Sequence, residues 1–243
     1  MISIQGLRKC YGEKVAVHEL DLEIEAGVFY TFLGPNGAGK TTTMKVMAGL
    51  LQPTGGKVTI DGLDVTKDPV EAKKRIGYIP DHPFLYGRLT GREYLAFVAG
   101  LYRMTPDVVR TQGEELLEIF GLQTEADDLI SSFSHGMRQR LAFAACFLHD
   151  PKVVIIDEPW VGLDPRNIRT TIDFLREKAK TGVTIFMSTH SLDLAENVAE
   201  SVGILTHGRL VFNGTLDELR SSDDSTDDLE EIFLTLTESQ PAV

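Results

Sequence analysis

Lys40 and Thr41 close a glycine-rich run that fits the pattern G-x-x-x-x-G-K-[ST]; the run is Gly34, Pro35, Asn36, Gly37, Ala38, Gly39, Lys40, Thr41 and Thr42. Its glycines let the backbone wrap closely around phosphate groups, and successive N–H groups would point at the anion. Lys40 would supply positive charge to the β- and γ-phosphates, and the Thr41 hydroxyl could ligate Mg²⁺. The pattern therefore predicts a nucleotide-binding loop.

The segments on either side of this loop fit the same chemistry. An apolar, β-prone run from Val28 to Leu33 precedes it, and the stretch from Thr42 to Leu50 has the spacing of a helix. A strand, a glycine-rich loop and a helix N-terminus together make an anion-binding site. An isolated glycine-rich turn, the alternative interpretation, would not require this order.

A pair of carboxylates follows the apolar run Val153–Ile156, which is typical of a strand buried on both faces of a parallel sheet. Asp157 at the end of this run would hold Mg²⁺, and Glu158 would polarise the water that attacks the γ-phosphate. A strand that ends in a solvated turn is the alternative. The phosphate loop upstream favours the catalytic interpretation, which is a Walker B element.

Composition limits the other possibilities. The chain has 243 residues, 42% of them hydrophobic, and a formal net charge of -12 at pH 7. This charge argues against nucleic acid as a partner, because nucleic-acid-binding proteins usually carry a basic face. The two cysteines, Cys10 and Cys146, have no metal-like spacing and indicate a reducing compartment. We find no signal peptide and no apolar run near the ~18 residues of a membrane span.

The order of predicted elements defines a fold class. Residues 1–32 read as strands, with an alternation of apolar residues that breaks near His18. Short strands follow near 57–60, 76–79, 153–156 and 183–187, whereas residues 90–148 have helical spacing almost throughout. The sequence therefore predicts an α/β protein in which a helical segment is inserted between strands of a mostly parallel sheet.

The segment just before the Walker B element resembles a family signature. Phe133-Ser134-His135-Gly136-Met137 is similar to the Leu-Ser-Gly-Gly-Gln motif of the ATP-binding-cassette (ABC) ATPases. Ser134 and Gly136 match the motif, whereas Phe133, His135 and Met137 depart from it. In the family this loop binds the γ-phosphate of the nucleotide held by the other subunit, and Ser134 is also a suitable helix N-cap.

Other family motifs occur in the expected order. Tyr11 stands where the family has an aromatic residue that stacks on adenine. The segment 162–165, Gly-Leu-Asp-Pro, resembles the D-loop, and its Asp and Pro also suit a helix start. His190 resembles the switch histidine, which would contact the γ-phosphate and help to place Glu158 and the water. The resemblance covers about residues 1–215.

Asp81 is a departure from the family pattern. The family usually has Gln at this position, where it approaches Mg²⁺ and the attacking water. A carboxylate is a good ligand for a hard cation, so Asp81 could still approach the metal. The alternative is that Asp81 only caps the turn at His82-Pro83, and the sequence leaves both interpretations open.

The resemblance implies a fold and a set of partners. It implies a P-loop NTPase core with an N-terminal antiparallel β subdomain and an α-helical subdomain inserted at about residues 82–150, in an ATPase domain of residues 1–215. Residues 216–243 would form a short helical tail. Two subunits, most simply a homodimer, would bury two ATP molecules with Mg²⁺ and drive a separate multi-span permease. The chain would then be cytoplasmic and peripheral on the inner face of the cell membrane.

The variants around residues 77–81 and 133–139 are similar to the export-type subfamily of bacitracin-resistance, sodium-export and Ecs-type systems. We therefore expect an exporter ATPase. A soluble ABC ATPase acting on ribosomes or nucleic acid is the alternative, although such relatives usually have two cassettes or basic surfaces. A P-loop kinase or GTPase would leave Ser134, Gly136 and His190 unexplained, and no Asn-Lys-x-Asp motif occurs.

Overall fold

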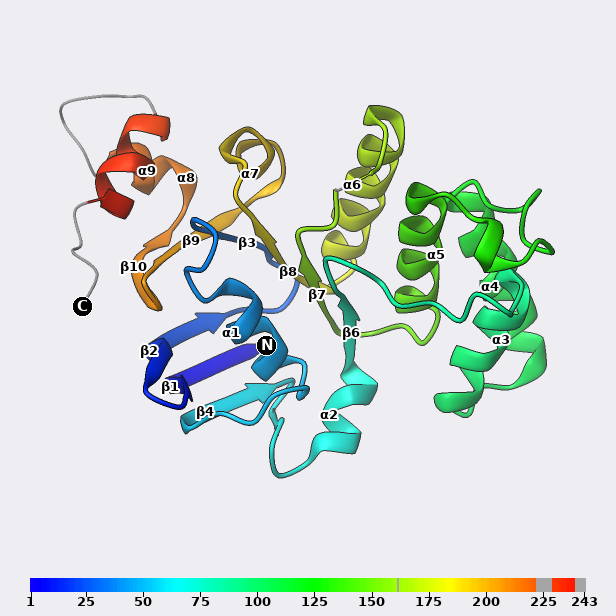
Figure 1. Cartoon of the computed structure of the whole chain (residues 1–243), viewed down its shortest axis with the longest axis horizontal. Helices are drawn as coiled ribbons and strands as arrows, with labels where there is room; N and C mark the ends of the chain where they lie inside the picture. The colour runs from blue at the N-terminus through cyan, green and yellow to red at the C-terminus, as the bar shows by residue number, and fades with distance from the viewer. Residues whose placement is uncertain (161, 222–228, 239–243) are drawn as a thin grey trace.

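The computed structural model describes residues 1–160, 162–221 and 229–238. Two β-sheets enclose the first helix, α1 (Lys40–Met47), as Figure 1 shows. The smaller sheet is antiparallel and has the strand order β2-β1-β4-β5. Its strands are β1 (Ile2–Tyr11), β2 (Lys14–Ile24), β4 (Gly55–Ile60) and β5 (Leu63–Asp64). This sheet is the predicted N-terminal antiparallel subdomain.

The larger sheet has the order β10-β9-β3-β8-β7-β6, in which only β10 runs antiparallel to its neighbour. Its strands are β3 (Phe29–Leu33), β6 (Ile76–Ile79), β7 (Val153–Asp157), β8 (Thr184–Thr189), β9 (Ser201–Thr206) and β10 (Arg209–Gly214). Every residue of β3, β7 and β8 is buried, as expected for strands covered on both faces. The predicted mostly parallel sheet is confirmed.

The inserted helical segment forms a lobe at one end of the molecule (Figure 1). It contains α3 (Gly91–Leu101), α4 (Pro106–Ile119), the short 3₁₀ helix η1 (Ile130–Ser132) and α5 (His135–Phe147). Local sequence explains the helix starts: Thr90 forms a capping box with Glu93, and Pro106 occupies the first position of α4. The lobe packs onto β6 and β7 through one apolar cluster that includes Ile79, Phe143 and Ile156.

The remaining helices flank the sheets. They are α2 (Pro69–Arg75), α6 (Pro165–Lys180), α7 (Leu192–Val198), α8 (Leu216–Arg220) and α9 (Leu229–Glu238). In the tail, Leu229 and Ile232 are buried against Leu33 and Ile204 of the large sheet, so α9 packs onto the domain. Among the described residues, no helix combines the length and apolar character that crossing a bilayer requires.

Candidate nucleotide site

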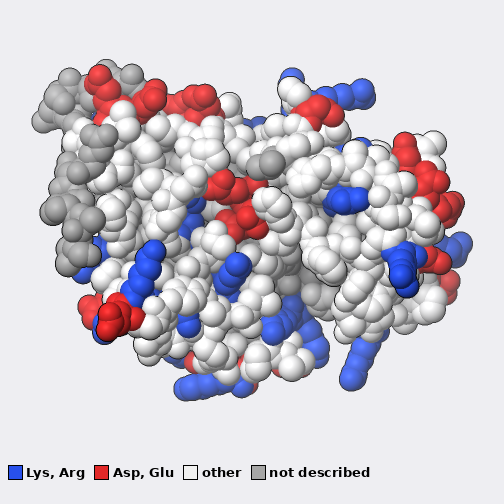
Figure 2. Space-filling model, in the orientation of Figure 1, with Lys and Arg blue, Asp and Glu red and all other residues white. Residues whose placement is uncertain are grey.

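The phosphate loop, residues 34–42, joins β3 to α1 and forms the floor of a cleft of about 800 Å³. The helix starts at Lys40, two residues earlier than its spacing indicates, because Gly39 serves as the N-cap with φ 108°. The predicted residues that line the cleft are Tyr11, Asn36, Gly37, Ala38, Gly39, Lys40, Thr41, Thr42 and Glu158. Figure 2 shows acidic side chains gathered in a hollow near the middle of this face, close to where β7 and β8 lie in Figure 1.

Lys40 is held in the loop by its own neighbours. Its side chain is only 6% exposed, and Nζ donates hydrogen bonds to the carbonyls of Gly34 at 2.6 Å and Pro35 at 3.2 Å. Burial lowers the pKa of the Lys40 ammonium, and the nearby charge of Glu158 opposes this effect. Phosphate oxygens can replace the loop carbonyls as acceptors, so this ammonium is positioned to bind a nucleotide.

Glu158 connects the phosphate loop to the end of β8. Its Oε1 lies 3.5 Å from Lys40 Nζ, and its Oε2 lies 2.8 Å from Nδ1 of His190. The backbone of Glu158 has φ 43°, a left-handed conformation that costs a non-glycine residue ~1–2 kcal/mol. Such strain persists where the surrounding structure fixes it, typically at functional sites. Three residues predicted from separate motifs are thus in contact.

The two carboxylate oxygens of Asp157 differ in their hydrogen bonding. Its Oδ1 accepts a 2.7 Å hydrogen bond from the Ser188 hydroxyl, whereas Oδ2 is buried without a hydrogen-bond partner among the described residues. A buried carboxylate oxygen of this kind fits a divalent cation. No group of three His, Cys, Asp or Glu side chains in the described ranges is arranged around a metal, so Mg²⁺ would also need the Thr41 hydroxyl, waters and phosphate oxygens.

Tyr11 lines the cleft at the end of β1, where the chain turns into β2. Its ring is half exposed, and Lys9 Nζ lies 5.2 Å from the ring centroid. An exposed aromatic face beside the phosphate loop can stack on a purine base.

Ser134 and Gly136 do not line this cleft. They lie at the start of α5, where Ser134 Oγ accepts a 3.2 Å hydrogen bond from the backbone N–H of Met137, so the predicted N-cap is confirmed. Gly136 lies against the backbone of Gly162, because a Cβ atom there would lie 2.8 Å from the Gly162 carbonyl oxygen. A Cβ on Gly162 would in turn meet the His135 ring at 2.3 Å.

The D-loop also caps a helix, as expected. Asp164 Oδ1 accepts a 2.9 Å hydrogen bond from the backbone N–H of Asn167, and Pro165 begins α6. The start of α5 and the turn before α6 therefore form one continuous surface. The signature residues Ser134 and Gly136 therefore lie on a different surface from the cleft that the phosphate loop lines.

Asp81 makes the turn contact that the sequence offers as one alternative. Its side chain is 57% exposed, Oδ1 accepts from the backbone N–H of His82 at 2.9 Å, and Oδ2 lies 3.1 Å from His82 Nδ1. Burial first, and then the charges of Asp157 and Asp81, raise the pKa of Tyr78. The charges of Asp81 and Asp157 thus both disfavour ionisation of the Tyr78 hydroxyl. A metal-binding role for Asp81 stays a prediction.

The sequence interpretation misses a wall of the cleft formed by the β9–β10 turn. Gly208 donates a 2.8 Å hydrogen bond from its N–H to the carbonyl of Ala38, and its own carbonyl accepts one of 2.8 Å from the N–H of His18. The side chains of His207 and Arg209 line the cleft beside the phosphate loop. The turn therefore braces the phosphate loop against β2 and adds a cation to the site.

One signal for this wall is visible in the sequence. The alternation of apolar residues breaks near His18, and Glu19 there has φ 43°. The pairing of β1 with β2 gains a residue at this point, since Leu7 pairs with Leu20 and Lys9 with Val17. At this irregularity the N–H of His18 does not pair with β1 and instead bonds to the Gly208 carbonyl in the β9–β10 turn. The sequence marks the irregularity but does not indicate that Gly208 is the acceptor.

Comparison with known proteins agrees with this geometry. The ABC transporter family model matches residues 17–161. The chain is 38% identical to the daunorubicin/doxorubicin resistance ATP-binding protein DrrA of Streptomyces peucetius, over 91% of this chain and 67% of that protein. It is 39% identical to the bacitracin transport ATP-binding protein BcrA of Bacillus licheniformis, over 90% of this chain and 71% of that protein.

Two solved structures share the whole architecture. An ATP-binding subunit of an ABC transporter superposes with a TM-score of 0.91 at 32% identity, covering 97% of this chain and 99% of that one. The ATP-binding cassette MJ0796, solved as a dimer in a post-hydrolysis state with ADP and Pi, superposes with a TM-score of 0.81 at 26% identity. The superposition covers 88% of this chain and 98% of that one. The chain belongs to the ABC transporter family. Within that family it is an ATP-binding, ATP-hydrolysing subunit.

Proposed function

We propose that this chain is the ATPase subunit of an exporter, in which two copies close around two ATP molecules with Mg²⁺ and drive a separate multi-span permease. Relatives named for drug resistance and for bacitracin transport support the export direction. The observation that carries the catalytic part is the contact of Glu158 with both Lys40 and His190.

Each predicted residue has a role in this proposal. Lys40 and the backbone of residues 34–42 bind the phosphates, and Tyr11 stacks on the adenine. Glu158 accepts a proton from the attacking water, and His190 holds the Glu158 carboxylate in place. Thr41 and Asp157, with Asp81 as a further candidate, would hold Mg²⁺, which neutralises charge on the phosphate oxygens when bound. Ser134 and Gly136 bind the γ-phosphate of the partner's nucleotide.

We propose that the chain is one ATPase domain followed by a short tail. Residues 1–215 would form the ATPase domain with a helical insert at about 82–150, and residues 216–243 a tail, of which 222–228 and 239–243 lie outside the described residues. Packing of Leu219, Leu229 and Ile232 against the large sheet supports a tail that belongs to this domain.

An aromatic patch on the helical lobe is the proposed permease contact. Phe84 is 83% exposed and Tyr86 50% exposed, with their ring centroids 5.9 Å apart, and Tyr86 also packs edge-on against Phe97. Leu85 between them packs against the core, so the three consecutive apolar residues divide between core and surface. We expect Tyr86→Ala to weaken permease binding and transport, and unchanged transport would remove its anchor role.

Co-purification tests the function directly. The chain would be pulled down from detergent-extracted native membranes, where it would lie on the inner face through its partner. Recovery with a multi-span protein that raises Mg-ATP turnover is the expected result. Recovery with ribosomes, or strong stimulation by nucleic acid, would contradict the proposal. The Lys and Arg side chains on the face shown in Figure 2 are dispersed and form no basic stripe for such a partner.

A further inference from the structure

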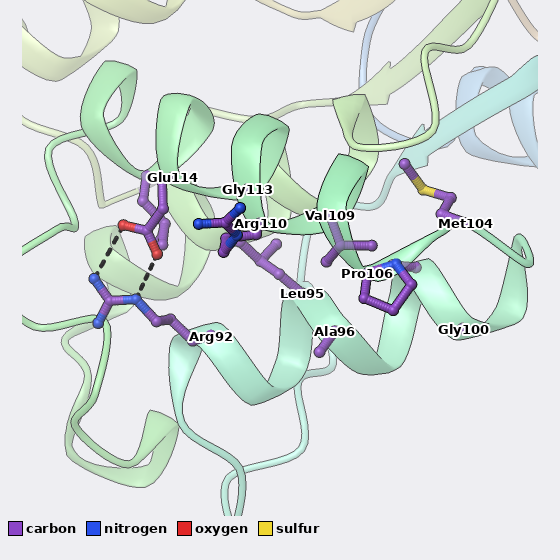
Figure 3. A pocket seen from close by; sticks show the side chains of 12 residues that line it. Arg92, Leu95, Ala96, Gly100, Met104, Pro106, Val109, Arg110, Gly113 and Glu114 are labelled. Atoms are coloured by element: carbon purple, nitrogen blue, oxygen red, sulfur yellow. Dashed lines mark hydrogen bonds and ion pairs between the residues drawn. The ribbon is translucent and has the colours of Figure 1, made fainter.

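A cavity of about 450 Å³ lies in the helical lobe between α3 and α4 (Figure 3). Most of its lining is apolar, from Leu95, Ala96 and Ala99 on one helix to Val109 and Leu117 on the other. Its volume is in the range of roughly 300–1,000 Å³ that small-molecule sites occupy, and such sites are mainly apolar with a few polar groups. No residue lines both this cavity and the nucleotide cleft.

Small residues keep the cavity open. Ala96 and Gly100 on α3 are one turn apart on the same helix face. Gly113 lies on α4 beside Glu114, toward the other end of the cavity from Gly100 (Figure 3). A Cβ atom on Gly100 would meet nothing within 4 Å, and one on Gly113 would meet only Leu95 Cδ1 at 3.7 Å. Ala96, Gly100 and Arg110 are exposed, so the cavity is open to solvent and a ligand can enter it from the surface.

Two arginines stand at the opening, and only one of them is fully engaged. Arg92 donates to both carboxylate oxygens of Glu114, at 2.6 and 3.1 Å, and to Asp127 at 2.5 Å. The Arg110 side chain is 79% exposed and forms a 3.6 Å ion pair with Asp107, one turn away on α4. Such an exposed surface pair contributes little to stability. Figure 3 shows Arg110 beside the cavity, between Glu114 and Val109.

We propose that this cavity binds a small amphiphile whose apolar body fills the space between α3 and α4 and whose anionic head group pairs with Arg110. Burial of the body removes apolar surface from water on both sides. The exposed Arg110–Asp107 pair is weak, so the guanidinium can exchange it for charge-assisted hydrogen bonds to a sulfonate, carboxylate or phosphate. The cavity shares no lining residue with the nucleotide cleft, and neither Tyr86 nor Phe97 of the aromatic patch lines it.

The probe for this site is 1-anilinonaphthalene-8-sulfonate, which combines an aromatic body with an anion. Binding to the full chain would be followed by calorimetry and by NMR of ¹³C-labelled methionine methyl groups. Met104 lines the cavity, whereas Met44 and Met187 are buried elsewhere in the core and serve as internal references. We expect saturable binding that shifts the Met104 signal and leaves the two reference signals in place.

Three variants decide the outcome. Gly100→Leu fills the cavity from a position with open space and should weaken binding at least ~10-fold, while Arg110→Gln should weaken it a few-fold. Phe84→Ser, on the exposed aromatic patch, is the matched control and should bind as the wild type does. Gly100→Ala, a smaller change in the same place, should give an intermediate loss.

Several results would overturn the proposal. They are an unmoved Met104 signal, binding that Gly100→Leu leaves unchanged, binding that Phe84→Ser removes, or self-association that Gly100→Leu blocks in the absence of the probe. The last result would show that a second copy of the chain, rather than a small molecule, covers the cavity. None of these outcomes depends on ATP turnover.

Discussion

The backbone N–H of Gly208 lies 2.8 Å from the carbonyl oxygen of Ala38, so the turn between the last two strands of the large sheet is hydrogen-bonded to the phosphate loop. A Cβ atom on Gly208 would lie 2.7 Å from the carbonyl oxygen of Ala16, and one on Gly39 would lie 2.5 Å from the same oxygen. The phosphate loop is therefore fixed between β2 and this turn, and its geometry depends on residues almost 170 positions later in the chain.

Gly208→Ala should weaken ATP binding about tenfold, because the added methyl group displaces the turn from Ala16 and with it the phosphate loop. Gly62→Ala is the control, since Gly62 has a similar φ of 78° but nothing within 4 Å of its Cβ position. Both variants should lose ~1–2 kcal/mol of stability from the left-handed backbone. Equal ATP affinity in the two variants, measured by calorimetry, would contradict the bracing role.

Glu158→Gln should lower Mg-ATP turnover by about 10²–10⁴-fold, because an amide cannot accept the proton of the attacking water. ATP affinity should stay within about threefold, since Lys40 and the phosphate loop that bind the phosphates are unchanged. Single-turnover kinetics with direct ATP-binding measurements separate the two quantities. Glu177→Gln, on the exposed face of α6, is the control and should change neither quantity. A Glu158→Gln variant that hydrolyses ATP normally would remove Glu158 from the catalytic role.

Asp81→Ala should lower turnover about tenfold, equivalent to about 1.4 kcal/mol, if the carboxylate helps to hold Mg²⁺. ATP binding in the absence of Mg²⁺ should be unchanged, because Asp81 does not line the nucleotide cleft. The comparison with His82→Ala is informative, since that change removes the ring contact to Asp81 and keeps both the backbone hydrogen bond and the carboxylate. If both variants have the same effect, Asp81 serves the turn and not the metal.

Asp64 should make stability depend on pH in the acid range. Its Oδ1 accepts hydrogen bonds from Thr66 N at 2.9 Å, Thr66 Oγ1 at 2.7 Å and Lys67 N at 3.2 Å. The Thr66 side chain is the largest of the causes that hold the pKa of Asp64 below its usual value. The folded form therefore binds fewer protons than the unfolded form in this pH range. The stabilisation is complete above the pKa of Asp64 in the unfolded chain, about 3.9, and is lost as the pH falls through the lower pKa of the folded state.

Asp64→Asn should therefore cost ~1–3 kcal/mol near pH 7, and the difference from the wild type should shrink below about pH 4. Urea unfolding across this pH range measures it. Asp68→Asn is the matched control, because the Asp68 side chain makes no capping hydrogen bond at the start of α2. A difference between wild type and Asp64→Asn that is constant with pH would contradict the assignment.

The parts of the site that depend on local pattern are predictable from the sequence. The phosphate loop, the strand that ends in Asp157 and the caps at Ser134 and Asp164 each follow from a few consecutive residues. The same holds for the fold class, because long apolar runs predict buried parallel strands and helical spacing predicts the inserted lobe. The contact of Glu158 with Lys40 and His190 requires the family order in addition.

The remaining features depend on pairing between distant segments. The strands β9 and β10 carry no chemical motif, so neither they nor the role of Gly208 is visible in the sequence. The break in the alternation of apolar residues near His18 indicates an irregular strand. The pattern does not indicate that the His18 N–H bonds to the carbonyl of Gly208. The cavity between α3 and α4 depends on the helix crossing, which the spacing of small residues does not determine.

The close fit between the start of α5 and the turn before α6 has a consequence for how the sequence can change. Gly162 has φ 80°, and its missing side chain leaves the room that the His135 ring occupies. A larger residue at position 162 would collide with the His135 ring and would also be strained by the left-handed backbone, so a smaller residue at position 135 would relieve only the first effect. We therefore expect relatives of this chain to vary at position 135 more readily than at position 162.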